Sequence, residues 1–366
     1  MRPMARSTRR QFIQTATAAA SGLALTNCGW TLAEVRATGS KGSKDELFVY
    51  TWTSYIDDQL LSEFTAQTGI KVKADIFDSD DVMLNTFQAG KGVNYSIIYP
   101  SAYGVERMIE LKLLLQLDQS KLIGLDSIKP KFRDPPYDPG NRYSIPISWG
   151  TTGLIYNSEK LPTPPEDWDY LWKNKDKLFR RMTLLNDVRE VMGAVLRSLG
   201  YSYNSKNLKE IERAYQKLEE LRPAIRLFTT DAWKEQILAG DIYLAMGYSS
   251  DGESVTQENP KLKYVIPRSG TSLWSDNMVI PKTAPNPDGA YAWINYMSQP
   301  SVAASVCRRL SFATPNQGAF DQLPLDIREN PTLFPPDEIL EKCESIAPVG
   351  DAAEIYDNYW TKLTSS

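Results

Sequence analysis

The chain has 366 residues, a formal net charge of −4 and no histidine, together with nine tryptophans and nineteen tyrosines. The lack of histidine excludes every mechanism that needs an imidazole base or an imidazole metal ligand. The acidic balance argues against a nucleic-acid partner, because phosphates require a basic surface. Several aromatic residues stand near acidic residues in separate segments, a combination suited to binding an organic cation.

The first 28 residues have the pattern of an export signal. They hold four arginines and no acidic residue, followed by a short apolar stretch at 16–25. This stretch is too short to cross a bilayer, and residues 8–13 (Thr-Arg-Arg-Gln-Phe-Ile) resemble the twin-arginine signal of bacteria. Removal of the four arginines would change the formal net charge from −4 to −8. We therefore expect a periplasmic bacterial protein.

The end of this signal allows two interpretations. Residues 25–28 (Leu-Thr-Asn-Cys) resemble a lipobox, in which Cys28 would carry the lipid, although Asn27 stands where that pattern has a small residue. Alternatively, cleavage near Ala33 or Ala37 would discard Cys28. Residues 29–44 are expected to form a tether, and the mature protein is either lipid-anchored or free.

Strands and amphipathic helices alternate through the next part of the chain, as in an α/β layer. The predicted order is strand 47–51, helix 57–69, strand 70–76, helix 80–89, strand 95–99 and a helix around 105–111. In open α/β sheets the loops after strand ends carry the ligand groups. Residues 52–55 and 101–103 are such loops.

A second unit follows, after which the strand character of the first unit resumes at 277–281. Its predicted elements are strands 143–148 and 153–157, helices starting at 166–177, strand 181–186, helices 187–199, 208–221 and 232–239, and strand 242–248. We expect two lobes, one of residues 45–151 and 275–320, the other of residues 152–274 and 321–366. Such a pair of lobes would close on a ligand in the cleft between them.

Two short segments pair acidic residues with features suited to a ligand. On a strand, Trp274 and Asp276 would share a face and offer an aromatic wall beside a counter-charge. Asp187 and Glu190 would project from one side of a helix's first turn. The alternatives are a surface-packed tryptophan with a solvated aspartate, and a helix capping box.

Further aromatic and hydroxyl side chains lie at the predicted strand ends, where they would suit either ligand contact or lobe packing. They are Trp52, Thr53, Ser54, Tyr55, Ser101, Tyr103, Tyr248 and Phe312.

The remaining chemistry is limited. Cys307 and Cys343 are the mature chain's two cysteines, and they form either a disulfide or two separate thiols. The chain has no G-x-S-x-G, S-x-x-K or phosphate-binding loop motif, so no nucleophilic enzyme is indicated and no cofactor is expected. An exported glycosidase with a carboxylate pair is the enzymatic alternative.

A series of short motifs resembles the periplasmic spermidine/putrescine-binding proteins of ABC importers over essentially the whole mature chain, from about Leu47 to Leu363. In order they are Tyr50, Thr51, Trp52, Thr53; Pro100, Ser101, Tyr103; Ile145, Pro146, Trp149, Gly150; Asp187, Arg189, Glu190; Trp274, Asp276; and Thr314, Pro315, Asn316.

This resemblance implies the two-lobed type II periplasmic-binding fold, with a mixed sheet flanked by helices in each lobe. It also implies a non-enzymatic protein that binds a polyamine and delivers it to an ABC permease, and a monomer is the default expectation. Ferric iron or a sugar on the same fold is the alternative ligand, and a sensor would carry the same pocket. The resemblance assigns aromatic walls to Trp52, Tyr55, Tyr103, Tyr248, Trp274 and Phe312, ammonium partners to Asp187, Glu190 and Asp276, and hydroxyl contacts to Thr53 and Ser101.

Four positions depart from the spermidine-binding pattern. Ser54 replaces an acidic residue, Tyr248 a tryptophan, Ile346 a glutamine and Phe312 a tyrosine. The loss of a carboxylate and an amide removes two polar partners of a buried amine. The preferred ligand is therefore left open between putrescine and spermidine.

Overall fold

The structure is a computed structural model that describes residues 43–53, 55–90 and 92–365. The expected export signal, the lipobox with Cys28, most of the tether and Ser54 lie outside the described residues.

A mixed sheet forms the centre of the described chain, with strand order β2-β1-β3-β9-β4-β7-β5-β6 and β8 paired to β4. The strands are β1 Glu46–Thr51, β2 Lys71–Ile76, β3 Ile97–Ile98, β4 Ser144–Asn157, β5 Met182–Leu184, β6 Ile225–Phe228, β7 Leu244–Tyr248, β8 Leu262–Val265 and β9 Leu273–Val279. β1 is parallel to β2 and β3, β5 is parallel to β6 and β7, and β9 is antiparallel to β3 and β4.

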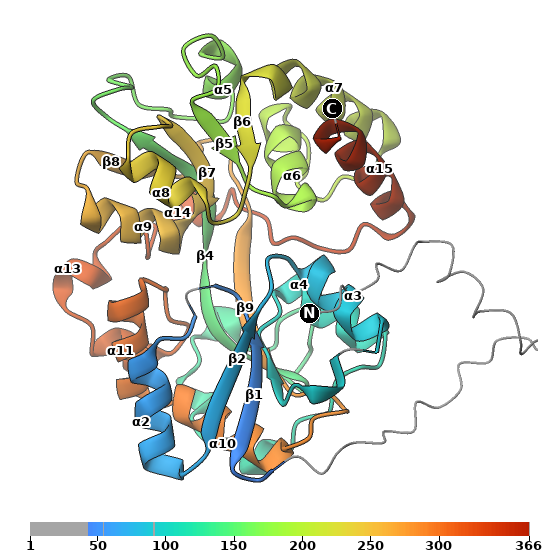
Figure 1. The fold of residues 1–366 in the computed structure, drawn as a ribbon, viewed down its shortest axis with the longest axis vertical. Helices are drawn as coiled ribbons and strands as arrows, with labels where there is room; N and C mark the ends of the chain where they lie inside the picture. The colour runs from blue at the N-terminus through green and yellow to red at the C-terminus, as the bar shows by residue number, and fades with distance from the viewer. Residues whose placement is uncertain (1–42, 54, 91, 366) are drawn as a thin grey trace, which may run out of the picture. The chain divides into compact units, whose positions relative to one another are not determined.

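β4 joins the two halves of this sheet. Its residues 144–151 pair with β9, and its residues 152–157 pair with β7 and β8. We call β1, β2, β3, β9 and the early part of β4 the first half, and β5 to β8 with the later part of β4 the second half. Figure 1 shows β4 and β9 running between the helices of the two halves.

The prediction of two separate strands at 143–148 and 153–157 was wrong, because β4 is one continuous strand of 14 residues. Gly150 does not make a turn there. A Cβ at this position would lie 2.4 Å from both Ser249 Oγ and Trp274 Cζ2. The glycine instead permits the close approach of two neighbouring side chains to the strand.

Helices cover both halves (Figure 1). Those of the first half are α2 Asp58–Thr68, α3 Asp80–Gln88, α4 Ala102–Glu110, α10 Pro287–Met297, α11 Pro300–Leu310 and α12 Gln317–Asp321, followed by the short α13 Leu325–Arg328 and α14 Asp337–Leu340. Those of the second half are α5 Tyr170–Lys173, α6 Val188–Ser198, α7 Leu208–Leu221, α8 Trp233–Leu238, α9 Ser249–Glu258 and α15 Ala353–Thr364. The helical block expected at 166–177 is only the four residues of α5, whereas α7 has the expected bounds.

The cores of the two halves follow from the apolar spacing of these elements. Ile211, Ala214, Leu218 and Leu221 recur at helical intervals on α7 and are all buried. They pack with strands β5 and β6 in the second half. A separate cluster in the first half contains Trp293 of α10 with residues of β1, β3 and β9. Each half therefore has its own hydrophobic core.

The C-terminal part of the chain contacts both halves in turn. Leu333 is buried in the core of the first half, and the ring of Phe334 lies 6.0 Å from that of Trp149. Tyr356 and Leu363 of α15 are buried in the core of the second half. The chain thus passes from one half to the other between Phe334 and α15.

The two mature-chain cysteines are free thiols in this structure. Cys307 is buried in α11, in a small cluster with Ala304 and Leu323, while Cys343 donates to the backbone oxygen of Ile339 at 3.4 Å. Of the two interpretations of this pair, the structure has the two separate thiols.

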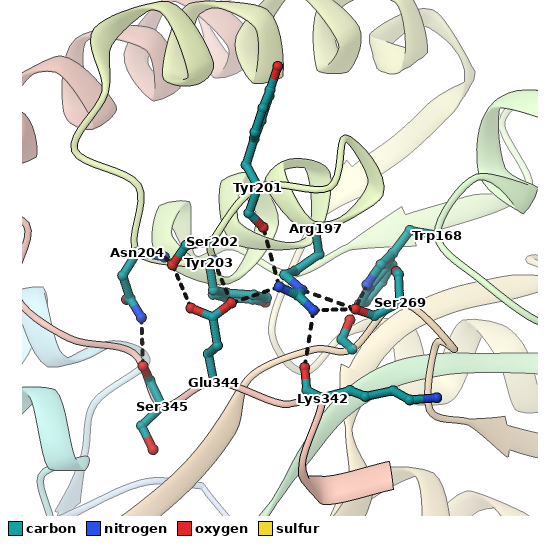
Figure 2. Close-up of polar contacts among 11 residues, drawn as sticks. Trp168, Arg197, Tyr201, Ser202, Tyr203, Asn204, Ser269, Lys342, Glu344 and Ser345 are labelled. Atoms are coloured by element: carbon teal, nitrogen blue, oxygen red, sulfur yellow. Dashed lines mark hydrogen bonds and ion pairs between the residues drawn. The ribbon is translucent and has the colours of Figure 1, made fainter. Parts of the chain in front are cut away.

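A polar network fixes the passage between the halves (Figure 2). Arg197 of α6 donates from Nε to the backbone oxygen of Ser269 at 3.1 Å and from Nη2 to that of Lys342 at 3.3 Å. Its Nη1 forms an ion pair with Glu344 at 2.9 Å, and both side chains are largely buried. Glu344 pairs through its backbone with Ser272, just before β9. The network therefore holds residues 342–344 against both α6 and the start of β9.

We expect Arg197→Met to lower the free energy of unfolding by about 2 kcal/mol, because it leaves Glu344 and two carbonyl oxygens without their charged partner. Urea denaturation measures this change. Arg107→Met is the matched control, since its ion pair with Glu110 is more exposed and should change stability by less than about 0.5 kcal/mol. Equal effects of the two substitutions would contradict the structural importance of the network.

Candidate functional site

A cleft lies where the two halves of the sheet meet. Every predicted binding residue that the structure describes lines it: Trp52, Thr53, Tyr55, Ser101, Tyr103, Asp187, Glu190, Tyr248, Trp274, Asp276 and Phe312. The twelfth, Ser54, lies outside the described residues. The structure therefore brings together segments that are far apart in the sequence.

Strand ends and helix starts meet at this cleft. Trp52 and Thr53 follow β1, and Ser101 is the N-cap of α4 directly after β3. Asp187 is the N-cap of α6 after β5, and Tyr248 ends β7 where α9 begins. Loops at strand ends are the usual ligand-binding position in an α/β sheet, and this was the basis of the prediction.

Trp274 and Asp276 lie two residues apart on β9 and both face the cleft. The alternative of a surface tryptophan beside a solvated aspartate is wrong, because β9 lies inside the sheet between β3 and β4 and Asp276 is only 7% exposed. The ring of Tyr248 approaches that of Trp274 edge-on, with centroids 5.8 Å apart. One aromatic wall therefore combines residues of both halves.

Two other ring pairs complete the aromatic surface. The ring centroids of Trp52 and Phe77 lie 4.4 Å apart, and those of Tyr55 and Phe312 lie 4.0 Å apart. Tyr55 and Phe312 are largely buried in the first half, so they serve both as core and as cleft lining. Phe77 was not predicted, although it follows β2 in the same way that Trp52 follows β1.

Asp276 is a buried carboxylate in an environment that favours its protonated form. The hydroxyl of Tyr55 donates to its Oδ2 and also contacts Ser148 Oγ. Burial raises the pKa of Asp276 well above its usual value, the Tyr55 hydrogen bond opposes the rise, and the nearby charges of Asp80 and Glu190 add to it.

Asp187 and Glu190 both line the cleft, and both also contribute to the local structure around α6. Asp187 caps α6 by accepting from the backbone N–H groups of Arg189 and Glu190 at 2.9 and 3.0 Å. Glu190 does not complete a capping box; its carboxylate accepts from the hydroxyls of Ser272 and Tyr203, each at 2.8 Å. Burial and the charge of Asp187 raise the pKa of Glu190 to about 7.

Asp80, a cleft residue that sequence reasoning missed, lies opposite in the first half. The Ser101 hydroxyl donates to its Oδ2, and the Ser101 N–H donates to its Oδ1 at 3.1 Å. Gly104 makes room for it, since a Cβ there would lie 2.3 Å from Asp80 Oδ1. Burial raises the pKa of Asp80 to about 7. Its position just after β2 is the signal that could have identified it.

A further group of cleft residues was also missed: Asp231, Lys234 and Asp251. The ammonium nitrogen of Lys234 lies 3.1 Å from Asp231 Oδ1 and 2.6 Å from Asp251 Oδ1. Thr53 of the first half donates its hydroxyl to Asp231 Oδ2 at 3.3 Å, across the cleft. The exposed Asp78 and the side chain of Ile346 line the cleft as well.

The carboxylates thus differ in their partners. Within the described part of the chain, no lysine or arginine nitrogen lies within 4.0 Å of the carboxylates of Asp80, Asp187, Glu190 or Asp276. A buried acid without a cation resists ionisation, and an incoming cation would lower its pKa. The arrangement is chemically suited to capturing a cation.

Comparison with known proteins identifies the family. Residues 59–335 match the model for bacterial extracellular solute-binding proteins. The chain therefore belongs to this family, and the type II fold class expected from the sequence is confirmed.

Named relatives share most of their length with this chain. It is 34% identical to the spermidine/putrescine-binding periplasmic protein of Salmonella typhimurium, over 87% of this chain and 91% of that one. It is 30% identical to the putrescine-binding periplasmic protein SpuD of Pseudomonas aeruginosa, over 94% and 97%. The structure of the spermidine/putrescine ABC transporter substrate-binding protein PotD from Streptococcus pneumoniae superposes with a TM-score of 0.75, at 36% identity, over 88% and 99%.

The buried Asp80 predicts an unusual pH dependence of the ligand-free protein. The folded protein holds a proton on Asp80 up to about pH 7, whereas the unfolded chain releases it near pH 4. This group therefore lowers stability as pH rises from about 4 to about 7. Asp80→Asn stays neutral, so its stability relative to wild type should increase by about 3 kcal/mol between pH 5 and pH 8.

Urea denaturation without ligand at the two pH values measures this difference. An unchanged offset between variant and wild type would show that Asp80 is ionised in the folded protein at pH 5.

Proposed function

We propose that the protein captures a polyamine, such as putrescine or spermidine, outside the cytoplasm and delivers it to an ABC-type permease. The observation that carries this proposal is the set of four carboxylates, three of them buried and Asp187 half-buried, that form no ion pair among the described residues and line an aromatic cleft. The names of the relatives in Salmonella and Pseudomonas point to the same ligands. The protein would act in transport and not as an enzyme.

The carboxylates group into two pairs, one on each half. Asp187 and Glu190 lie in the first turn of α6, and the charge of Asp187 raises the pKa of Glu190. Asp80 and Asp276 are joined through Ser101, which hydrogen bonds to Asp80 with its side chain and pairs with Asp276 through its backbone. A linear diamine would place one ammonium group at each pair and so hold the two halves together.

The aromatic rings would cover the methylene chain of such a ligand. Cation–π contact contributes about 0.5–2 kcal/mol per ammonium, more when water is excluded.

Closure of two lobes is the proposed capture motion. The early part of the chain up to about residue 151 and residues 275–320 would form one lobe, and residues 152–274 the other. Because Leu333 and Phe334 pack with the first half, we place the last crossing between the lobes near 341–351 and not at 321. The permease would bind the closed form of the monomer.

The proposed route to this compartment is export by the twin-arginine-type signal, with Cys28 as the candidate lipidation site. No helix among the described residues is long and apolar enough to cross a membrane. Ferric iron, a sugar or a glycosidase reaction are the other functions considered from the sequence, and a ligand panel separates them from polyamine binding.

The proposal predicts that only polyamines stabilise the protein. Thermal unfolding of residues 44–366 should shift upward with putrescine, spermidine or spermine and not with citrate-chelated iron or maltose. A hundredfold excess over the dissociation constant adds about 2.7 kcal/mol to stability. No shift with any polyamine would mean that the fold has been kept for another ligand.

Asp276→Asn tests the assignment of the central carboxylate. Asparagine keeps an acceptor for the Tyr55 hydroxyl but removes the negative charge, so polyamine affinity should fall by about a hundredfold. Isothermal titration calorimetry measures the change. Asp288→Asn is the control, because Asp288 lies on α10 with a side chain 85% exposed. Equal affinities of wild type and Asp276→Asn would refute the assigned role.

A further inference from the structure

We propose that Lys234 acts as a resident ammonium group that fills a third acidic position of the cleft, so that the protein selects a diamine over a triamine. This inference rests on the proposed polyamine function and adds the ligand class to it. It assigns a specificity-determining position to a residue that the sequence motifs did not identify.

The first argument is the geometry of a third acidic pair. Asp231 follows β6 and Asp251 lies in the first turn of α9, so both belong to the second half, as do Asp187 and Glu190. Unlike those two acids, they share one cation, the Nζ of Lys234, at 3.1 and 2.6 Å. The ammonium group thus sits between two cleft carboxylates, as a ligand's ammonium would.

The second argument is burial. Lys234 is the second residue of the short helix α8, after Trp233, and its side chain is only 22% exposed. The side chain of Asp251 is 17% exposed and that of Asp231 is 40% exposed, so solvent competes less for the contact of Lys234 with Asp251 than for its contact with Asp231. Although burial favours the neutral amine, the charges of Asp251 and Asp231 raise the pKa of Lys234 above its usual value. The lysine therefore stays charged at neutral pH and neutralises this part of the cleft.

The third argument is the position of the pair relative to the ligand groups. Thr53 donates to Asp231, and it neighbours Trp52, whose indole lines the same cleft. A third ammonium of a longer ligand that reached this region would meet Lys234 and be repelled by it. Asp78 is the remaining cleft carboxylate, and its exposure leaves it screened by water.

Two acidic pairs without a cation and one that is already filled match a ligand with two charges. Wild type should therefore bind putrescine more tightly than spermidine. Lys234→Met keeps an apolar stem of similar length but removes the charge, which leaves the Asp231 and Asp251 pair free for a third ammonium. The ratio of spermidine to putrescine affinity should then rise by about tenfold or more.

The experiment measures the dissociation constants of putrescine and spermidine by calorimetry for wild type, Lys234→Met and Lys234→Gln. Lys217→Met is the matched control. Lys217 is also buried, with a side chain 20% exposed, and pairs with Asp169 at 2.7 Å, but it lies on α7 and does not line the cleft. It should lose stability as the Lys234 variants do without any change in the affinity ratio.

The outcomes separate this inference from the function it rests on. If wild type binds polyamines but neither Lys234 variant changes the ratio beyond the Lys217→Met control, the selectivity role is overturned and the proposed function stands. A wild-type preference for spermidine would also overturn it. If wild type binds no polyamine, the proposed function fails.

If wild type binds no polyamine, a second measurement still tests the role of Lys234. Lys234→Ala removes the side-chain atoms beyond Cβ, which correspond to a propylammonium ion. Thermal unfolding of wild type and of this variant is therefore measured with propylammonium chloride and, as the control, with sodium chloride. Stabilisation of the variant alone by propylammonium would support an ammonium position between Asp231 and Asp251. The absence of a specific effect would overturn it.

Discussion

The cost of burying carboxylates next to one another is the constraint on which this cleft depends. Asp80 of α3, Asp187 and Glu190 at the start of α6, and Asp276 of β9 line one cleft. Without a cation, burial and mutual repulsion favour their protonated forms. The ligand-free protein therefore holds several carboxylates in a position that disfavours their ionised forms, and a bound cation would favour those ionised forms. In the proposed function, the same interaction would drive both ligand binding and closure of the two halves.

The surrounding structure holds the acids in place without neutralising them. Asp187 accepts hydrogen bonds from the first turn of α6, Asp80 from Ser101, and Asp276 from Tyr55. These donors are backbone N–H groups and hydroxyls, which orient a carboxylate but carry no full charge. Lys234 differs, because it places a full positive charge between Asp231 and Asp251. In the proposed selectivity, this difference between oriented and neutralised acids would set how many ammonium groups the cleft accepts.

The elements that form the cleft are themselves held by contacts outside it. Tyr203 donates its hydroxyl to Glu190, and its backbone N–H donates to Glu344, the partner of Arg197. Tyr203, which belongs to the network in Figure 2, thus connects Glu190 with the chain segment that passes between the halves. Ile346, two residues after Glu344, lines the cleft. The position of this segment and the shape of the site are therefore coupled through a few polar contacts.

Local sequence pattern determined most of the elements and the ligand-facing ends of the strands. The helical spacing of Ile211, Ala214, Leu218 and Leu221 gave α7 its bounds, and the two-residue spacing of Trp274 and Asp276 placed both on one face of a strand. These features depend on residues close in sequence, so a single chain is enough to read them. The resemblance to a known family then implied that these separate segments meet in one binding cleft.

Tertiary structure alone decided the partners of the acids and the path between the halves. Gly150 leaves room for Ser249 and Trp274, two residues that are distant in sequence. Its surroundings could therefore not be predicted from the local sequence, which favoured a break where β4 is continuous. Lys234 and Asp251 meet only because α8 and α9 pack together. Charge pairing acts through space over a few ångströms, and spacing along the chain carries no information about it. For that reason the sequence by itself determined which residues could bind a cation, while the folded chain decided which of them are free to do so.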